Sequence, residues 1–242
     1  MKIVVIISAN AEWRVVKELY PDLALQQSPF GEYADLRLST LREPQGNALD
    51  LQLFHGGWGK ISAAATAQYV IDHFQPDLLV NLGTCGGFAG RIQTGTVILV
   101  ERTLVYDILE QMGDGAEAIE HYATEIDLSW LNDRRPKTVD RDSMHRLSSI
   151  VHGLMVSADR DIVVEDIPML IEKYGAVAAD WESGAIAWVA KKNGTRLLIL
   201  RAVSDLVGGA GGEAYGNLDL FHERTKTVMK DLFRQLPDWL NV

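Results

Sequence analysis

The sequence predicts an α/β fold: a three-layer α/β/α sandwich with a mixed, largely parallel central sheet. Short apolar runs rich in β-branched residues alternate with helical patterns along the whole chain, which is typical of a sheet covered by helices on both faces. The content of 47% hydrophobic and 23% charged residues is that of a globular protein. The 242 residues exceed a typical domain of ~150 residues, but no linker or repeat divides them. We therefore expect residues 1–242 to form a single domain.

Buried parallel strands are predicted where a short apolar run is followed by a turn and, in most cases, a helical pattern. Alternating apolar and polar residues at 49–53 instead predict a half-exposed strand, paired with residues 34–38, and this pair makes the expected sheet a mixed one. The runs predicted to be buried strands are 2–7, 78–82, 97–100, 154–156, 177–179 and 197–203.

Helices are predicted where apolar residues recur with helical spacing, and Pro76, Gly175 and Gly194 supply stop signals. Residues 107–142 lack a clear period and are expected to form a loop or lid. The glycine-rich residues 208–212 predict a flexible stretch that either closes over a site or merely connects a strand to the last helix. The predicted helices span residues 11–19, 61–74, 167–174, 182–192 and about 218–236.

Charge and composition exclude several classes of function. The net charge is 23 − 33 = −10, which argues against nucleic acid and membrane surfaces as partners. The single cysteine, Cys85, cannot form an intramolecular disulfide, and the first apolar run is too short for a signal peptide, so a cytoplasmic location is expected. The histidines show no metal-ligand spacing, and neither a Walker loop nor a dinucleotide fingerprint is present. We expect no metal and no cofactor.

Carboxylates follow three of the predicted strands. In α/β sheets ligands bind beyond the carboxyl ends of the strands, so Glu12, Glu182 and Asp205 are expected to converge at one sheet edge. Hydrolysis of a glycosidic bond needs two carboxyl groups, an acid for the leaving group and a base for water. Each carboxylate alone could equally complement a helix N-terminus. The glycine-rich residues 83–87 are predicted to form a turn that offers backbone amides to a ligand.

Six motifs, taken in order, resemble the nucleoside phosphorylase superfamily of the purine and uridine phosphorylase type, and within it the methylthioadenosine/S-adenosylhomocysteine nucleosidases. The likeness covers nearly the whole chain, and the six motifs together are far more specific than any one of them. They are the first strand ending at Glu12, Gly57-Trp58-Gly59-Lys60, residues 81–87, residues 157–163, Asp180-Trp181-Glu182-Ser183-Gly184-Ala185, and Arg201-Ala202-Val203-Ser204-Asp205.

The resemblance implies a role for each matching residue. Glu12 would be the general base that activates water, and Asp205 the general acid at purine N7, with a pKa raised by burial or neighbouring carboxylates. Glu182 would hold the ribose hydroxyls, with Trp181 beneath the sugar, and Ile162 would lend its backbone to the base edge. A homodimer is also implied. The remaining residues expected to bind substrate are Thr84, Cys85, Gly86, Asp180 and Ser204.

Missing arginines favour water over phosphate as the nucleophile. Phosphorylases of this superfamily carry arginines at the positions of Glu12 and Asn81, and a phosphate dianion beside Glu12 would be repelled. The expected activity is therefore hydrolysis of a purine nucleoside similar to methylthioadenosine or S-adenosylhomocysteine. The alternatives are a phosphate-dependent purine nucleoside phosphorylase, a nucleosidase similar to futalosine hydrolase, and a non-catalytic nucleoside-binding protein.

Two departures from the family pattern bear on the substrate. Asp161 stands where the family stacks an aromatic residue on the purine. Either Trp181, Phe88 or a lid residue supplies the stacking, or the base differs, or Asp161 pairs with Arg160 at the surface and the match slips by one residue. The second departure is the segment 107–142, which should build the 5′ side of the pocket and does not clearly match the adenosine thioether enzymes.

Overall fold

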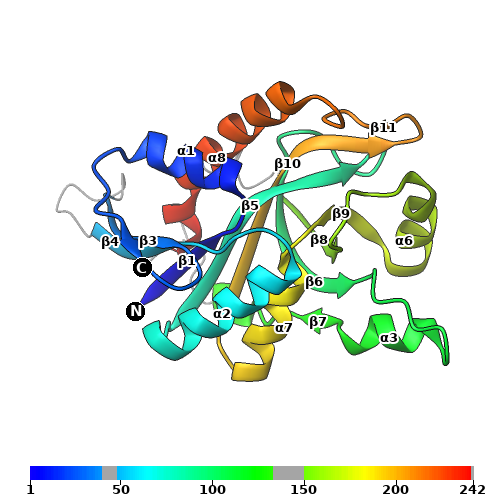
Figure 1. The fold of residues 1–242 in the computed structure, drawn as a ribbon, viewed down its shortest axis with the longest axis horizontal. Coiled ribbons are helices and arrows are strands. Elements are labelled where there is room, and N and C mark those ends of the chain that lie inside the picture. The colour runs from blue at the N-terminus through cyan, green and yellow to red at the C-terminus, as the bar shows by residue number, and fades with distance from the viewer. Residues whose placement is uncertain (40–47, 133–149, 241–242) are drawn as a thin grey trace.

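A mixed sheet forms the centre of the computed structural model, which describes residues 1–39, 48–132 and 150–240 (Figure 1). The central strands are nearly continuous runs of buried aliphatic residues, as expected when helices cover both faces. The strands are β1 (Ile3–Ile7), β2 (Gln26–Gln27), β3 (Glu32–Ser39), β4 (Ala48–His55), β5 (Leu78–Phe88), β6 (Val97–Val105), β7 (Thr124–Glu125), β8 (Ile150–Ser157), β9 (Ala176–Asp180), β10 (Leu197–Gly208) and β11 (Gly211–Gly212).

The strand pairing confirms the predicted mixture of directions. Strand β1 lies between β4 and β5 and is parallel to both. Strand β3 pairs antiparallel with β4, as the alternation at residues 49–53 predicts. Strand β10 is parallel to β5 but antiparallel to β6. The sheet is thus mixed and flanked by helices, which is the predicted fold class.

Five strands close a ring that the sequence did not indicate. Strand β10 pairs with β5 and β6, β6 pairs with β8, and β8 pairs with β9. Strand β9 in turn pairs with β5 and closes the ring. Closing this ring requires β5 to run past its predicted end at residue 82, because it pairs with β9 at Gly86 and Gly87. The prediction of a turn over residues 83–87 was therefore wrong, because these residues lie inside β5.

Glycine permits β5 to pass close to its neighbours in this ring. A Cβ atom on Gly83 would lie 2.3 Å from Nη1 of Arg201 and 2.7 Å from Oε1 of Glu12. The missing side chain at Gly83 thus makes room for two charged groups at the sheet edge.

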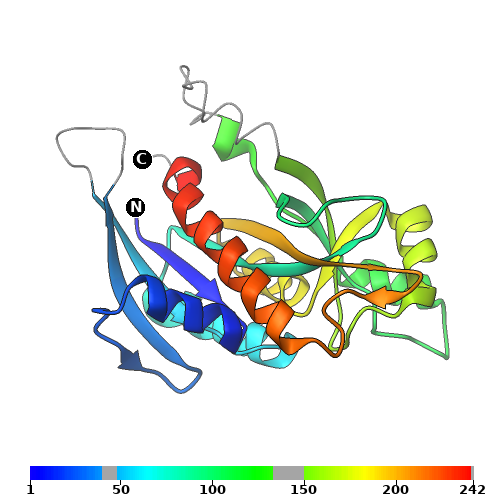
Figure 2. The same cartoon turned by 90° about the horizontal axis from the view of Figure 1, so that it is seen from above.

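Helices cover the two faces of the sheet in separate layers. Figures 1 and 2 show α1 and α8 side by side on one face, while Figure 1 shows α2 and α7 on the other. A third apolar cluster lies beneath α6. The helices are α1 (Asn10–Leu19), α2 (Lys60–Phe74), α3 (Gly115–His121), α4 (Ser129–Asn132), α6 (Ile167–Tyr174), α7 (Ser183–Asn193) and α8 (Leu218–Leu240), with a 3₁₀ turn at Val164–Asp166.

Every predicted helix is confirmed to within a few residues. Gly175 and Gly194 end α6 and α7 in the left-handed conformation, as their stop signals predict. Among the described residues, no helix has both the length and the apolar character needed to cross a membrane.

Two segments predicted to lack regular structure contain short elements. Within residues 107–132 the chain forms α3, β7 and α4, and the rest of the predicted lid, 133–142, lies outside the described residues. Residues 208–212 include a tight hairpin, because β11 folds back antiparallel on the end of β10. Both views place this hairpin at the same end of the molecule as α6 (Figures 1 and 2).

Candidate active site

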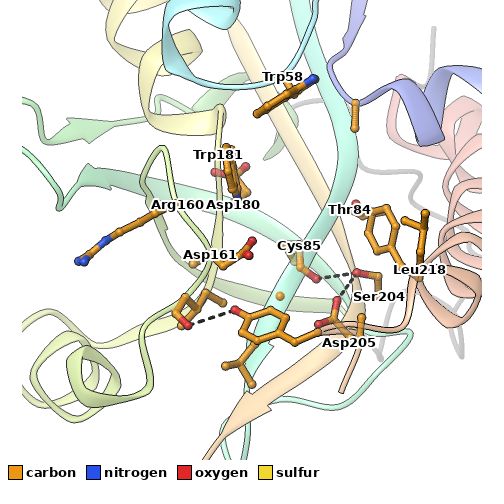
Figure 3. A pocket seen from close by; sticks show the side chains of 18 of the residues that line it. Trp58, Thr84, Cys85, Arg160, Asp161, Asp180, Trp181, Ser204, Asp205 and Leu218 are labelled. Carbon is orange, nitrogen blue, oxygen red and sulfur yellow. Dashed lines mark hydrogen bonds between the residues drawn. The ribbon is translucent and has the colours of Figure 1, made fainter. Parts of the chain in front are cut away.

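A cavity of about 530 Å³ lies beyond the carboxyl ends of the central strands (Figure 3). Figure 3 shows Trp58 and Trp181 near one end of it and Ser204 and Asp205 near the other. The structure brings together every residue predicted for the site. Those residues are Glu12, Thr84, Cys85, Gly86, Ile162, Asp180, Trp181, Glu182, Ser204 and Asp205.

Glu12 is held rigidly at the cavity wall by the start of α1 and by β5. The backbone N–H of Ala9 donates to Oε2 at 3.1 Å, which closes the first turn of α1. The backbone N–H and the hydroxyl of Thr84 donate to Oε1 at 2.6 and 2.9 Å. The residue is only 1% exposed. These donors fix the carboxylate in one orientation.

Arg201 is the main group that the sequence reasoning missed. It is buried, 1% exposed, and its guanidinium lies 3.0 Å from Oδ2 of Asp180, 3.6 Å from Oε2 of Glu182 and 3.9 Å from Oε1 of Glu12. A charged residue inside the apolar run 197–203 of a buried strand was the available signal, because a buried cation requires partners. Arg201 partly neutralises this group of carboxylates.

Asp180 supports Arg201. Its oxygens accept hydrogen bonds from the hydroxyl of Ser157 at 2.6 Å and from the hydroxyl and backbone N–H of Ser183, and Oδ2 forms an ion pair with Arg201. Although Asp180 lines the cavity, its carboxylate is already engaged by protein donors.

Glu182 is a buried carboxyl group of this cluster. The backbone N–H of Gly59 donates to its Oε1 at 3.1 Å. Burial raises the pKa of Glu182 to about 8, against the opposing effect of Arg201, and the nearby Asp180 and Glu12 add to the rise. Protein groups engage this carboxyl less completely than they engage Asp180, and it remains open to a ligand.

Asp205 occupies a β-bulge. The register of β10 against β5 shifts between Val203 and Asp205, a distortion that often re-aims a side chain beside a functional site. The hydroxyl of Ser204 donates to Oδ1 of Asp205 at 2.7 Å. Burial raises the pKa of Asp205, with further increases from Glu213 and Asp161, while Ser204 and Arg224 oppose the rise. The expected direction of this pKa shift is confirmed.

Asp161 and Arg160 point in different directions. Arg160 turns away from the cavity in Figure 3 and pairs with Asp166 at 2.5 Å, so the alternative in which it pairs with Asp161 is wrong. The carboxylate of Asp161 points into the cavity. Phe88 is fully buried in the apolar cluster beneath α6 and does not line the cavity. Phe88 therefore cannot supply the stacking face.

Tyr215 is an aromatic cavity residue that the sequence reasoning also missed. It follows the hairpin of β10 and β11, and its hydroxyl donates to the carbonyl oxygen of Ile162 at 3.1 Å. Burial and the nearby Asp161 and Asp205 raise the pKa of Tyr215 to about 12. The position of an aromatic residue directly after the glycine-rich segment was the available signal.

The other end of the cavity is aromatic and apolar. Trp58 is 59% exposed, and its ring meets that of Trp181 edge to face with centroids 5.5 Å apart. Leu218 and Phe221 of α8 line the cavity as well, with Leu218 beside Ser204 in Figure 3. The expectation that residues 107–142 build this side is not met by residues 107–132, none of which lines the cavity.

The cavity offers no free cation within the described part of the chain. Arg160 is the one cationic residue among those that line it, and it is paired with Asp166. Asn81 is buried behind the cavity, where its Oδ1 accepts from Arg201 at 2.7 Å and from Ser183 at 3.2 Å. A phosphate dianion would find carboxylates here rather than donors.

The arrangement suits acid–base chemistry on a small molecule. A fixed carboxylate, Glu12, lies on the same cavity as a carboxyl group with a raised pKa, Asp205, and polar and aromatic groups stand between and around them. Among the described residues there is no group of three or more side chains suited to hold a metal ion.

Comparison with known proteins identifies the relatives of this chain. A profile of the phosphorylase superfamily matches residues 4–236. The 5′-methylthioadenosine/S-adenosylhomocysteine nucleosidase of Buchnera aphidicola is 25% identical over 193 residues, which are 78% of this chain and 82% of that protein.

Solved structures show the same fold. The S-adenosylhomocysteine nucleosidase of Streptococcus pyogenes, in complex with 5-methylthiotubericidin, has a TM-score of 0.74 at 19% identity, covering 100% of this chain and 96% of that chain. A futalosine hydrolase mutant of Helicobacter pylori has a TM-score of 0.73 at 16% identity, covering 98% and 99%.

Proposed function

Because the chain belongs to the phosphorylase superfamily, we propose that it is an N-ribosyl hydrolase that cleaves the glycosidic bond of a purine nucleoside. The observation that carries the proposal is Glu12, a carboxylate fixed by Thr84 and Ala9 and accompanied by no free cation among the described cavity residues. This environment suits activation of water and repels phosphate.

The proposed reaction uses the two ends of the cavity together. Glu12 accepts a proton from water as its oxygen attacks C1′ of the ribose. The bond from C1′ to N9 breaks, its electron pair passes into the purine, and Asp205 donates a proton to N7. The base therefore leaves as a neutral purine. The raised pKa of Asp205 supports this role, since the acid must still hold its proton when the substrate binds.

Glu182 is proposed to bind the ribose hydroxyls. Its carboxyl group lines the cavity close to Glu12 through their shared partner Arg201. Ribose hydroxyls donating to Glu182 would favour its ionised form and offset the effect of burial on its pKa. Trp181, the neighbouring residue, then offers an apolar surface to the sugar.

The aromatic end of the cavity supports a substrate with an apolar 5′-substituent. Trp58 and Trp181 would flank an alkylthio group such as that of methylthioadenosine. The same pair of indoles favours, as a second candidate, a nucleoside with a planar 5′-substituent, as in futalosine. Either substrate uses the same two carboxyl groups for bond cleavage.

We further propose that residues 1–242 act as one nucleoside phosphorylase-like domain that forms a cytoplasmic homodimer. Site residues come from both ends of the chain, from Glu12 to Asp205, which supports a single domain. Ile61 and Met112 are 84% and 97% exposed, which supports contact with a second copy. Light scattering coupled to gel filtration measures the mass of the assembly, and a monomer would refute the dimer.

Release of free base from a nucleoside panel tests the activity. The panel contains methylthioadenosine, S-adenosylhomocysteine, adenosine, inosine and futalosine, each assayed with and without phosphate. We expect base release at the same rate in phosphate-free buffer. Release only with phosphate would show a phosphorylase, and binding without release would show a non-catalytic nucleoside-binding protein.

A further inference from the structure

Asp161 is an unpaired carboxylate in the half of the cavity that contains Asp205. Within the described chain it makes no hydrogen bond and no ion pair, unlike Glu12, Asp180, Glu182 and Asp205. It is exposed to the cavity, and its oxygens point inward in Figure 3. A charge left without a protein partner in a binding cavity is available to a ligand.

Several observations place Asp161 near the position of a bound base. Its neighbour Ile162 lines the cavity and accepts the Tyr215 hydroxyl at 3.1 Å. Negative charge at Asp161 raises the pKa values of both Asp205 and Tyr215, which requires proximity to both side chains. The one adjacent cation, Arg160, is directed away and held by Asp166. Asp161 therefore adds negative charge to this end of the cavity, and no adjacent cation neutralises it.

We propose that Asp161 stabilises the positive charge that the purine carries once Asp205 has transferred its proton to N7 and until the electron pair of the C1′–N9 bond enters the ring. The inference rests on the proposed function and explains why a carboxylate can replace an aromatic residue at this position. A neutral bound nucleoside gains little from a nearby carboxylate, whereas a purine that is receiving a proton at N7 gains much more. An interaction that strengthens only in the transition state raises kcat rather than lowering KM.

Burial is the main cause of the raised pKa of Asp205, and the charge of Asp161 adds to that rise. The groups that act on Asp205 are Ser204 on its own strand, Arg224 on α8, Glu213 after β11, and Asp161 after β8. Arg224 and Ser204 favour the carboxylate form, and Glu213 and Asp161 favour the protonated form. Arg224 is already engaged with Glu213 at 2.5 Å. Removal of Asp161 should therefore lower the pKa of Asp205 and move the alkaline limb of the rate profile to lower pH.

The experiment compares leaving groups in wild-type protein and in D161N, D161E and E165Q. Methylthioadenosine requires protonation of its base, whereas 4-nitrophenyl β-D-ribofuranoside releases a stable phenolate without it. E165Q is the matched control, because Glu165 is an exposed carboxylate on the same segment that does not line the cavity.

We expect D161N to lower kcat on methylthioadenosine about 30-fold, with KM changed less than about threefold, and to leave cleavage of the arylriboside nearly unchanged. D161E should recover most of the lost rate, and E165Q should match wild type. The alkaline limb of D161N should move to lower pH, and this readout decides the question even if the arylriboside is cleaved too slowly to measure.

Other outcomes overturn the proposal. An equal loss on both substrates, or a rise in KM alone, would show that Asp161 shapes the cavity and does not stabilise charge. An unchanged pH profile together with an unchanged kcat would show that it has no part in the reaction. Wild-type protein that releases no base from any nucleoside refutes the proposed function itself, and circular dichroism spectra of all variants confirm that each is folded.

Discussion

The two ends of the cavity differ in how far their acidic groups are paired with protein partners. At the Arg201 end, which this residue supports from behind without lining the cavity, the carboxylates of Glu12, Asp180 and Glu182 are buried, and each lies within 3.9 Å of the guanidinium. At the end that contains Asp205, the acidic groups belong to a bulge and to segments outside the main strands, and Asp161 has no partner among the described residues.

This difference suggests that one end of the cavity holds groups in fixed positions and that the other end sets the protonation of the acid. A saturated, buried network holds its members in one orientation, so the Arg201 end suits the positioning of water and ribose. The other end keeps acidic groups near each other without full compensation, which raises the pKa of Asp205 and leaves charge free for the ligand. The variants described below act on one end at a time.

The largest effect is expected from D205N, which removes the proton donor and keeps the shape of the side chain. Turnover of methylthioadenosine should fall about 10²- to 10⁴-fold, the usual range for loss of a general acid. Nucleoside binding, measured by calorimetry, should persist. A variant that retains more than a tenth of the wild-type rate would remove Asp205 from the proposed mechanism.

R201M is expected to act on folding as well as on activity. It leaves three carboxylates buried without their shared cation, a change that should lower the free energy of unfolding by about 3–5 kcal/mol. Urea denaturation followed by tryptophan fluorescence measures this change. R224M, which removes a partly exposed arginine from the Asp205 end, is the matched control and should cost about 1 kcal/mol or less. Equal losses in the two variants would contradict the contrast between the ends.

The pH dependence of kcat should show which end controls turnover. The active form of Asp205 is protonated, so the rate should fall about tenfold per pH unit above the pKa of Asp205. Because that pKa is raised, the fall should begin above pH ~3.9, the ordinary value for aspartate. If the residual activity of D205N shows the same fall of kcat at high pH, that fall reports the pKa of another group.

The smallest effect is expected from Y215F, which removes the hydroxyl that bonds to Ile162 and retains the ring. Loss of one partly buried hydrogen bond costs about 1 kcal/mol, or roughly fivefold in kcat/KM. Y215A also removes the aromatic face and should weaken binding further. If both variants bind nucleosides as the wild type does, Tyr215 lines the cavity but does not contact the bound base.

The sequence was informative where local pattern determines structure. Helix stop signals located the ends of α6 and α7, and the alternation at residues 49–53 identified the antiparallel pair of β3 and β4. The motif residues converged on one cavity because parallel strands deliver their carboxyl ends to the same edge.

The ring of strands and the role of Arg201 depend on contacts between distant segments, and no local pattern carries them. Glycines in residues 83–87 looked like a turn because glycine is common in turns, yet here it serves close packing between β5 and the groups around Arg201. Tyr215 was missed for the same reason, since its partner Ile162 is far away in sequence.

Arg201 already faces three carboxylates, and this arrangement restricts how the protein could come to use a different nucleophile. An arginine introduced at position 12 to bind phosphate would face Arg201, whose guanidinium lies 3.9 Å from the present Glu12 carboxylate. The new cation would therefore repel the old one and leave Thr84 with two donors and no acceptor. Exchange of water for phosphate thus requires several coupled substitutions, and single-step variants along that path should be inactive with either nucleophile.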